Sequence, residues 1–344
     1  MALIGDHRRT VYLNTVGTHV SIDHDAFQIR RPEQPMVRVP VQQVDSFVCF
    51  GNVEFSTAAL DRCARATISL SWMSRSGRFR MGIRAPTHGN VLLRIEQHQA
   101  AGDDRRRLDI AQMMVVAKLL NSRVVLLDAA KDRSMEAGSL RTIGAELINL
   151  ADQARVARDL DTLRGVEGHG AKRYFTGVAA LLHGSTFRFE SRERRPPTDP
   201  VNALLSFGYS LLALYCAGAL EHVGLDPQVG FLHPARPGRP SLALDLMEEL
   251  RAPLVDRLVL TLLNRRQLGD GSFEYLPTGA CLMTGTARVT FLAALDAHLA
   301  AEVAHRAIEQ SIERRKVVQV QALLLSRHLR GDLRHYLPFR TTGR

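Results

Sequence analysis

The N-terminal part of the chain has a strand-like pattern of apolar and polar positions. Between about residues 10 and 84, apolar residues alternate with polar ones or gather in short runs separated by turn-rich stretches. One segment near residues 58–66 predicts a short helix instead. The pattern therefore predicts a β-rich region built from the segments TVYLN, THVSI, FQIRR, MVRVPV, SFVCFG, VEF, TISLSW and FRMGI.

Beyond residue 89 the spacing changes, because apolar residues now recur at three and four positions. This spacing is typical of amphipathic helices. Asp199 followed by Pro200 predicts the start of one helix, with the aspartate as its cap and the proline in its first turn. The helical spacing runs through residues 108–120, 145–160, 170–182, 201–220 and 253–263.

Strands followed by helices, without alternation between them, predict an α+β protein with successive domains. We expect an N-terminal β domain over residues 1–88, a linker over 89–103 and a larger all-α-helical domain over 104–344. Residues 201–220 are almost continuously apolar, which also fits a membrane span. Their asparagine, serine and glycine residues favour a buried core helix, so no membrane association is expected.

The chain carries a formal net charge of +10 and has an isoelectric point near 10. A positive field of this size favours polyanionic partners such as nucleic acid. Only four residues are lysines, so arginine supplies most of the charge, and its planar guanidinium suits paired contacts to phosphate oxygens. A biased base composition of the source genome also explains the arginine excess, but it does not explain the net charge.

Several widespread motifs are missing from the sequence. G-x-x-x-x-G-K-[ST], G-x-G-x-x-G, G-x-S-x-G and H-E-x-x-H do not occur, which argues against ATP-driven, dinucleotide-dependent and serine-hydrolase activities. The four cysteines lie far apart without a C-x-x-C pair, so neither a zinc site nor a disulfide framework is indicated. The N-terminus lacks the apolar core of a secretory signal. A cytoplasmic protein is therefore expected.

Glu167 lies in a helical segment whose neighbouring residues are unusually small. Gly168 follows it directly, and Gly170 and Ala171 lie one turn further on. Each glycine lowers helix stability by roughly 1 kcal/mol relative to alanine, so the pair calls for a reason such as the close approach of another group. Small residues beside a carboxylate leave room for a metal ion and a DNA backbone. Taken alone, a solvated glutamate near a helix break is the simpler explanation.

Two further segments carry groups that bind metals. His233 ends an apolar run and precedes a rigid proline, although a lone histidine is more often structural. In the later segment SLALDLMEELR, Asp245 and Glu248 stand on one flank of a predicted helix while Glu249 points elsewhere. A solvated acidic helix face explains this segment equally well.

Together, one imidazole and two or three carboxylates make a mostly oxygen-donating site that suits Mg²⁺ or Mn²⁺ better than structural zinc. Such an ion polarises a phosphoryl oxygen and lowers the pKa of an attacking hydroxyl. Spacing alone does not show that the segments meet in space. On the residues alone, a basic two-domain protein is indicated, for which a metal-dependent nuclease is one open interpretation.

These segments resemble the motifs of a known family, the CRISPR-associated endonuclease and integrase that is the first core protein of spacer acquisition. EGHGAKRYF at residues 167–175 is similar to its glutamate motif, GFLH at 230–233 to its histidine motif, and SLALDLMEELR at 241–251 to its acidic helix. The order and spacing agree, and the resemblance covers essentially the whole chain, with type I systems the most similar. The strand-rich start and the tail segments RGD at 330–332 and YLPF at 336–339 extend it.

The resemblance implies which residues hold the metal. The ligands of the family fall on Glu167, His233 and Glu248, with Mg²⁺ or Mn²⁺ as cofactor. Some members place aspartate where this chain has Glu248, and Gly170 replaces a usual alanine, so this helix is expected to be locally looser. Asp245 and Glu249 are expected to support the ligands from behind, with Asp245 also open as an additional ligand.

The resemblance also implies a reaction and partners. In the family, the β domain mediates a homodimer, and two dimers flank a dimer of a small partner protein. A double-stranded DNA prespacer supplies 3′-hydroxyls that attack a phosphodiester at the boundary of the CRISPR repeat, without ATP. The residues that we expect to contact DNA phosphates are Arg173, Arg236, Arg239 and Arg251.

Two rival interpretations stay open. The first is a stand-alone structure-specific nuclease that uses the same metal but water as nucleophile. The second is a non-catalytic DNA-binding scaffold protein whose acidic residues are a solvated helix face.

Overall fold

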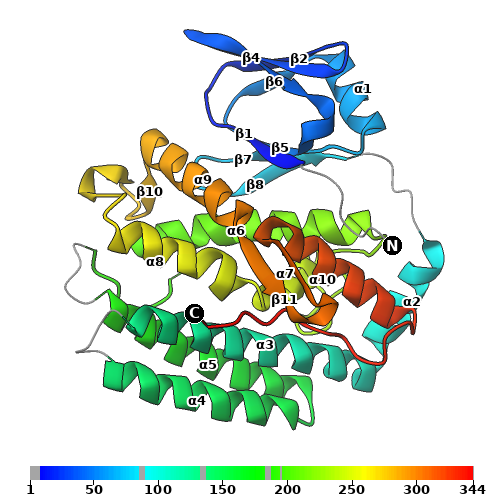
Figure 1. Ribbon diagram of the computed structural model, residues 1–344, viewed down its shortest axis with the longest axis vertical. Helices are drawn as coiled ribbons and strands as arrows, with labels where there is room; N and C mark the ends of the chain where they lie inside the picture. Colours follow the sequence, from blue (N-terminus) through cyan, green and yellow to red (C-terminus); the bar gives the residue numbers. More distant parts are fainter. Residues whose placement is uncertain (1–7, 85–89, 132–136, 183–186, 194–195, 344) are drawn as a thin grey trace. The chain divides into compact units, whose positions relative to one another are not determined.

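The computed structural model describes residues 8–84, 90–131, 137–182, 187–193 and 196–343. The chain divides into two compact units, Met1–Thr87 and His88–Arg344. The first is rich in strands and the second in helices (Figure 1). The predicted α+β class is therefore confirmed.

The first unit contains two four-stranded sheets, in the orders β1-β5-β7-β8 and β4-β3-β2-β6. In the first sheet, β1 and β7 both run parallel to β5, which lies between them, and β8 is antiparallel to β7 at the edge. A short helix, α1 (Thr57–Arg65), lies where a helix was predicted. The strands are β1 (Arg9–Leu13), β2 (Thr18–Asp23), β3 (Ala26–Arg31), β4 (Gln34–Pro40), β5 (Val44–Phe50), β6 (Val53–Phe55), β7 (Ser69–Met73) and β8 (Phe79–Ile83).

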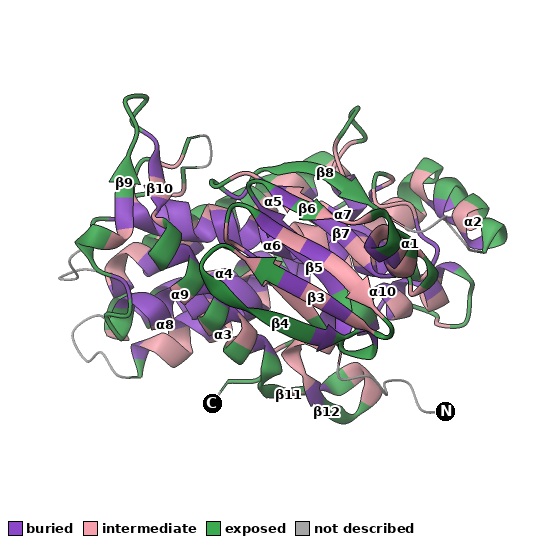
Figure 2. Ribbon diagram, turned by 90° about the horizontal axis from the view of Figure 1, so that it is seen from above, coloured by how far each residue is buried: buried purple, intermediate pink, exposed green. Residues whose placement is uncertain are grey.

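Aromatic residues form the centre of this β unit. Phe27 and Phe47 are fully buried and meet edge to face, with ring centroids 5.0 Å apart. In β2 and β3 buried residues alternate with partly buried ones and β5 is buried almost throughout, whereas β4 and β8 are exposed along almost their whole length (Figure 2). The hydrophobic pattern therefore places the core between the inner faces of the sheets.

The second unit is built around long helices whose starts are set by aspartate caps. Asp103, Asp159 and Asp199 each accept hydrogen bonds from backbone N–H groups in the first turn of the helix that follows, and Pro200 occupies the first turn as predicted. The helices are α2 (Val91–Gly102), α3 (Asp104–Ala130), α4 (Ala137–Arg155), α5 (Leu160–Leu181), α6 (Pro200–His222), α7 (Ser241–Glu248), a π-helical turn (Arg251–Asp256), α8 (Arg257–Asn264), α9 (Gly285–Ala300) and α10 (Arg314–Leu329).

Helices α3, α4 and α5 pack side by side in this unit (Figure 1). Two short hairpins interrupt the helical pattern, β9 (Phe273–Tyr275) with β10 (Cys281–Met283), and β11 (Glu302–His305) with β12 (Gln310–Glu313). The second unit is therefore mainly helical, with two small β elements that the apolar spacing does not predict.

The segment expected to be a linker, residues 89–103, contains helix α2 and belongs to the second unit. Helix α2 buries Leu93, Gln97 and Ala100, and Gln97 is fully buried. Its amide group donates to the carbonyl oxygens of Asp226 and Val229, at 2.8 and 2.9 Å, and accepts from the N–H of Asp226. A glutamine counts as polar in a hydrophobic pattern, so these buried hydrogen bonds to a distant loop were not predictable from spacing.

Helices α3 and α6 are long and apolar enough to cross a membrane on length and composition alone. Within each apolar window, 67% of the residues are buried inside the protein. The burial of α6 agrees with the prediction of a core helix for residues 201–220.

Candidate metal centre

Glu167 lies in the interior of α5, away from both helix ends, with its side chain 23% exposed. Three residues further on, Gly170 faces α3. A Cβ atom at Gly170 would lie 2.1 Å from the Leu119 Cδ2 atom, so a larger residue here would require the Leu119 side chain to shift. At Gly168 a Cβ atom would meet open space. Close approach therefore explains Gly170 but not Gly168, and α5 is continuous rather than broken near Glu167.

His233 lies in the loop between α6 and α7, and Asp245 on α7 fixes its position. The Asp245 carboxylate is fully buried and accepts from the backbone N–H groups of Phe231, Leu232 and His233, at 2.6, 3.0 and 2.9 Å. It also lies 2.6 Å from the His233 Nδ1 atom. A carboxylate accepts, so Nδ1 carries a proton, and in the neutral imidazole Nε2 then keeps a free lone pair. Asp245 therefore orients the imidazole, as a partner behind a metal ligand would.

A second contact joins the His233 loop to the helix of Glu167. Arg164, one turn before Glu167 on α5, donates from Nε and Nη2 to the carbonyl oxygen of Leu232, at 3.0 and 2.8 Å. The loop is also closely packed against α7, because a Cβ atom at Gly230 would lie 2.7 Å from an Asp245 carboxylate oxygen. Helix α5, the His233 loop and α7 are thus held against one another.

Glu248 is the last residue of α7 and its side chain is 3% exposed. It lies between two cations: its Oε1 atom is 2.9 Å from Arg251 Nη2, and its Oε2 atom is 2.6 Å from Lys118 Nζ. The Arg251 guanidinium is itself stacked over the Tyr209 ring, 4.8 Å from its centroid. The acidic flank of this helix is therefore buried and ion-paired, and the explanation of a solvated acidic face is wrong.

The Lys118 ammonium also forms an ion pair with Glu167. Glu167 and Glu248, on α5 and α7, therefore converge on one cation from α3. Sequence reasoning counted Lys118 only as one of four lysines and missed this role. A signal was present, because Lys118 is the one charged residue between Ile110 and Leu120, an otherwise mostly apolar stretch of the sequence.

The charges around Glu248 set its ionisation. Burial by itself raises the pKa of a carboxyl group. The positive charges of Arg251 and Lys118 outweigh burial and hold the pKa of Glu248 well below its ordinary value. In its protonated form, His233 would act in the same direction, which places the imidazole within electrostatic range of this carboxylate. Glu248 is therefore an anion at neutral pH despite its burial.

Glu249, the next residue, faces a different environment. Its carboxyl group is fully buried, and its Oε1 atom accepts from Gln321 Nε2 and from the Tyr336 hydroxyl, both at 2.7 Å. Burial raises the pKa of Glu249 to about 8, because these neutral donors offset only part of the desolvation. Glu249 therefore contacts the C-terminal segment rather than the ligands expected in the sequence analysis.

The donor set at this site fits a hard divalent cation. Two carboxylates and one imidazole with a free Nε2 atom are ligands that Mg²⁺ and Mn²⁺ accept. The Oε2 atom of Glu248 is buried and, within the described residues, has no hydrogen-bond partner, although it lies close to the Lys118 ammonium. Across the same described residues, no three histidine, cysteine, aspartate or glutamate side chains converge closely enough to coordinate one ion. The carboxylates are drawn to Lys118 instead.

The four arginines expected at DNA lie in different surroundings. Arg173 forms an ion pair with Glu146, and Arg236 is exposed in the loop that follows His233. Arg239 is partly buried in the same loop. Arg251 has a side chain only 13% exposed and is held by Glu248, so it belongs to the interior of the site.

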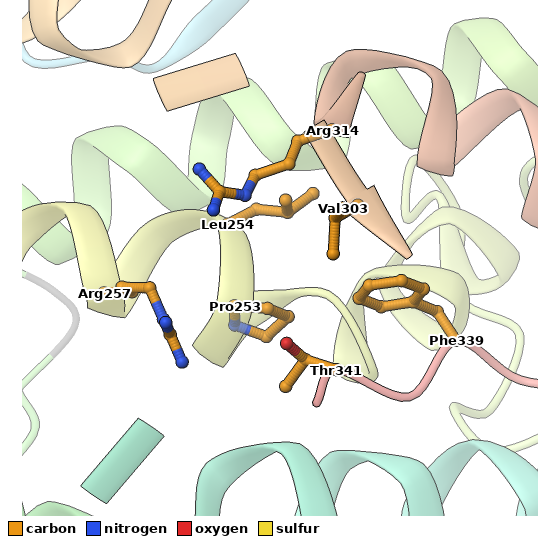
Figure 3. Close-up of a pocket in the computed structure, with 7 residues that line it drawn as sticks. All are labelled: Pro253, Leu254, Arg257, Val303, Arg314, Phe339 and Thr341. Atoms are coloured by element: carbon orange, nitrogen blue, oxygen red, sulfur yellow. The ribbon is translucent and has the colours of Figure 1, made fainter. Parts of the chain in front are cut away.

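A separate cavity in the second unit has a volume of about 20 Å³, room for about one water molecule (Figure 3). Its lining contains no carboxylate and no histidine, so it does not compete with the centre above as a cation site. The lining residues are Pro253, Leu254, Arg257, Val303, Arg314, Phe339 and Thr341.

Comparison with known proteins agrees with the geometry. The family model described as CRISPR associated protein Cas1 matches residues 11–297. The CRISPR-associated endonuclease Cas1 1 of Moorella thermoacetica is 40% identical over 334 residues, which cover 96% of this chain and 97% of that protein.

Two solved structures share the fold. One is a casposase bound to an integration product, with a TM-score of 0.82 and 22% identity over 94% of this chain and 91% of that one. The other is a chain of a Cas6-RT-Cas1–Cas2 complex, with a TM-score of 0.80 and 21% identity over 99% of this chain and 37% of that one. The extent of the family match and the near full-length identity to the Moorella protein identify this chain as a member of the Cas1 family of CRISPR-associated proteins.

Proposed function

We propose that this protein is a metal-dependent DNA integrase of CRISPR adaptation, which joins the 3′-hydroxyls of short double-stranded DNA fragments to the boundary of a chromosomal repeat. The observation that carries the proposal is the convergence of Glu167 and Glu248 on one buried cation, beside an imidazole that Asp245 orients. The name of the Moorella relative supports an endonuclease, and the integration product held by the casposase supports strand transfer on this fold.

In the proposed reaction, the oxygen of a fragment 3′-hydroxyl loses its proton and attacks a phosphorus atom in the repeat. A bond forms between them, the bond from phosphorus to the 3′-oxygen of the repeat breaks, and the leaving oxygen takes up a proton. The number of phosphodiester bonds is unchanged, so no ATP is required. A divalent cation bound at the site would neutralise charge on the phosphoryl group and lower the pKa of the attacking hydroxyl.

The residues of this chain contribute by positioning and charge. Glu167, His233 and Glu248 would hold the cation, and Asp245 keeps the His233 Nε2 atom free by accepting the Nδ1 proton. Arg251 keeps Glu248 ionised and fixed at the end of α7. Asp245 and Arg251 hold their partners in place before substrate arrives, which limits the reorganisation of these contacts during the reaction.

Partners follow from the same proposal. Strand β8 lies at the edge of its sheet and exposes Phe79, Met81 and Ile83, which are 49%, 50% and 37% exposed. An exposed apolar edge strand suits pairing with a second copy of the β unit, which supports the expected homodimer.

The net charge of +10 supports double-stranded DNA as substrate. The complex with Cas2 that contains a chain of this fold supports a small partner protein, and a cytoplasmic location follows from the DNA substrate.

A product assay tests the proposal. A labelled double-stranded fragment is incubated with a plasmid that carries the repeat, with Mg²⁺ or Mn²⁺ and with EDTA. We expect joined product only with metal, and its loss in Glu248→Ala with DNA binding retained, whereas Glu274→Ala, an exposed glutamate on β9, serves as the matched control.

The same assay separates the rival functions. Shortened fragments without joined product would indicate a stand-alone nuclease. DNA binding that needs no metal, with equal behaviour of wild type and Glu248→Ala, would indicate a scaffold protein.

A further inference from the structure

Lys118 occupies the side of the site where a metal would bind. It belongs to α3, its side chain is only 10% exposed, and its ammonium contacts a carboxylate oxygen of both Glu167 and Glu248. A lysine buried to this degree is rare unless its charge is paired. Both of its partners are ligands in the proposed function, so Lys118 and a divalent cation would compete for the same oxygens.

The charges around these oxygens balance without a metal. Two carboxylates, Glu167 and Glu248, face two cations, Lys118 and Arg251. A divalent ion added to this set leaves two uncompensated positive charges in a largely buried site, which is unfavourable. A DNA phosphodiester brings one negative charge and the attacking oxygen develops another. Metal and reacting DNA together therefore leave the charge of these four ion-paired groups balanced, whereas metal alone does not.

We propose that Lys118 is a positioning residue that holds the two carboxylates together in the metal-free protein and makes tight metal binding depend on DNA. This inference rests on the proposed function. When DNA binds, a phosphate oxygen replaces a carboxylate as a partner of the ammonium, and the released carboxylate oxygen becomes available to the cation. The enzyme thereby holds its metal weakly until a substrate phosphate is in place.

The test measures Mn²⁺ affinity directly, by electron paramagnetic resonance of the free ion, on the full-length protein. Each sample is titrated alone and with a double-stranded oligonucleotide whose 3′ ends are dideoxy-blocked, so that no reaction occurs. In the wild type, we expect the DNA to tighten Mn²⁺ binding by at least about tenfold, since a phosphate becomes the partner of the Lys118 ammonium and releases a carboxylate oxygen to the ion.

Lys118→Met removes the charge and keeps a similar apolar length. We expect it to bind Mn²⁺ at least about tenfold more tightly than the wild type without DNA, and to gain little further from DNA. Lys118→Arg keeps the charge and should behave like the wild type. Lys172→Met, at an exposed position of α5, is the matched control and should leave the affinity unchanged within about twofold.

The outcomes separate this inference from the proposed function. If Glu248→Gln binds Mn²⁺ as well as the wild type in the presence of DNA, the metal centre itself is wrong. If Glu248→Gln loses Mn²⁺ but Lys118→Met binds it equally or more weakly, the ammonium merely supports the fold and the inference is overturned. Should Lys118→Met not fold, the wild type still decides: equal Mn²⁺ affinity with and without DNA contradicts the inference.

Discussion

Glu248 and Glu249 are adjacent, and both carboxyl groups are buried, yet the two regions that surround them differ in charge. Glu248 faces Lys118 and Arg251, and its pKa lies well below the ordinary value. Glu249 faces neutral donors, and burial raises its pKa to about 8. Burial alone therefore does not decide the charge of a carboxyl group; the partners that share the burial decide it.

The two environments suit different tasks. The region of Glu248 supplies an anion to a cation site. The region of Glu249 ties down the C-terminal segment, because Gln321 bridges Glu249 and the Leu337 carbonyl, and Asn121 donates to the carbonyl oxygens of Glu249 and Phe339, at 2.7 and 2.9 Å. The same substitution should then impair both chemistry and stability at Glu248, and should lower only stability, by a smaller amount, at Glu249.

The largest expected difference is in strand transfer. Glu248→Gln keeps the shape of the side chain but removes a charged ligand, so we expect the rate to fall by about 100-fold or more. Glu249→Gln mimics the protonated carboxyl and should change the rate by less than about threefold. The rates of strand transfer are measured with fragments and repeat plasmid at saturating Mn²⁺. Equal losses of rate in both variants would show that Glu248 and Glu249 do not differ in their role.

A second difference is in stability at neutral pH. Glu248→Gln leaves the Lys118 and Arg251 charges buried without their shared partner, so the free energy of unfolding should fall by about 3–5 kcal/mol. Glu249→Gln keeps an oxygen that accepts from Gln321 and Tyr336 and should lower it by about 1 kcal/mol. Urea denaturation without metal measures both. A smaller loss in Glu248→Gln than in Glu249→Gln would show that the two cations do not depend on Glu248.

The third difference is in pH dependence. The pKa of Glu249 is raised in the folded protein, so its contribution to stability is fully present below its unfolded value of 4.5 and is lost as pH rises to about 8. Between pH 5 and 8 this amounts to about 2–4 kcal/mol. Asp256, with a pKa raised to about 6, adds a smaller loss in the same direction.

Glu249→Gln should therefore lose clearly less stability than the wild type between pH 5 and 8, because it lacks the Glu249 titration and keeps every other titrating group, including Asp256 and His298. Denaturant midpoints at several pH values, at constant ionic strength, measure the slopes. Parallel curves for the two proteins would mean that Glu249 is ionised across this range.

The smallest expected effect comes from Tyr336→Phe. This change removes the hydroxyl that donates to Glu249 Oε1, so the free energy of unfolding should fall by about 1 kcal/mol and the pKa of Glu249 should rise further. Strand transfer should be unchanged, because Glu248 keeps its own partners. Thermal melts and the product assay check both, and a marked loss of joined product would show that the two regions are coupled.

The sequence predicted the structure best where residues within a short stretch determine it. The change from alternating to three-and-four spacing predicted the strand-rich and helical parts, and Asp199 with Pro200 predicted the start of α6. The segments around Glu167, His233 and Glu248 were chosen from residue types and from the family resemblance. Both sources of information lie within short stretches of sequence.

What the sequence did not predict depends on contacts between distant segments. Lys118 and Glu167 are 49 positions apart, and Gln97 and Asp226 are 129 positions apart. Because of the first contact, Lys118 belongs to the site. Because of the second, the segment expected to be a linker is a helix packed against the loop of Asp226. The opposite surroundings of Glu248 and Glu249 have the same origin, because their partners come from α3 and from the C-terminal segment.

The central claim is that Glu167, His233 and Glu248 hold one divalent cation, and anomalous diffraction at the manganese edge from crystals grown with Mn²⁺ tests it most directly. We predict one strong peak within about 2.0–2.3 Å of a carboxylate oxygen of each glutamate and of the His233 Nε2 atom. A peak bound elsewhere, or these three side chains left without an ion at saturating Mn²⁺, would contradict the claim.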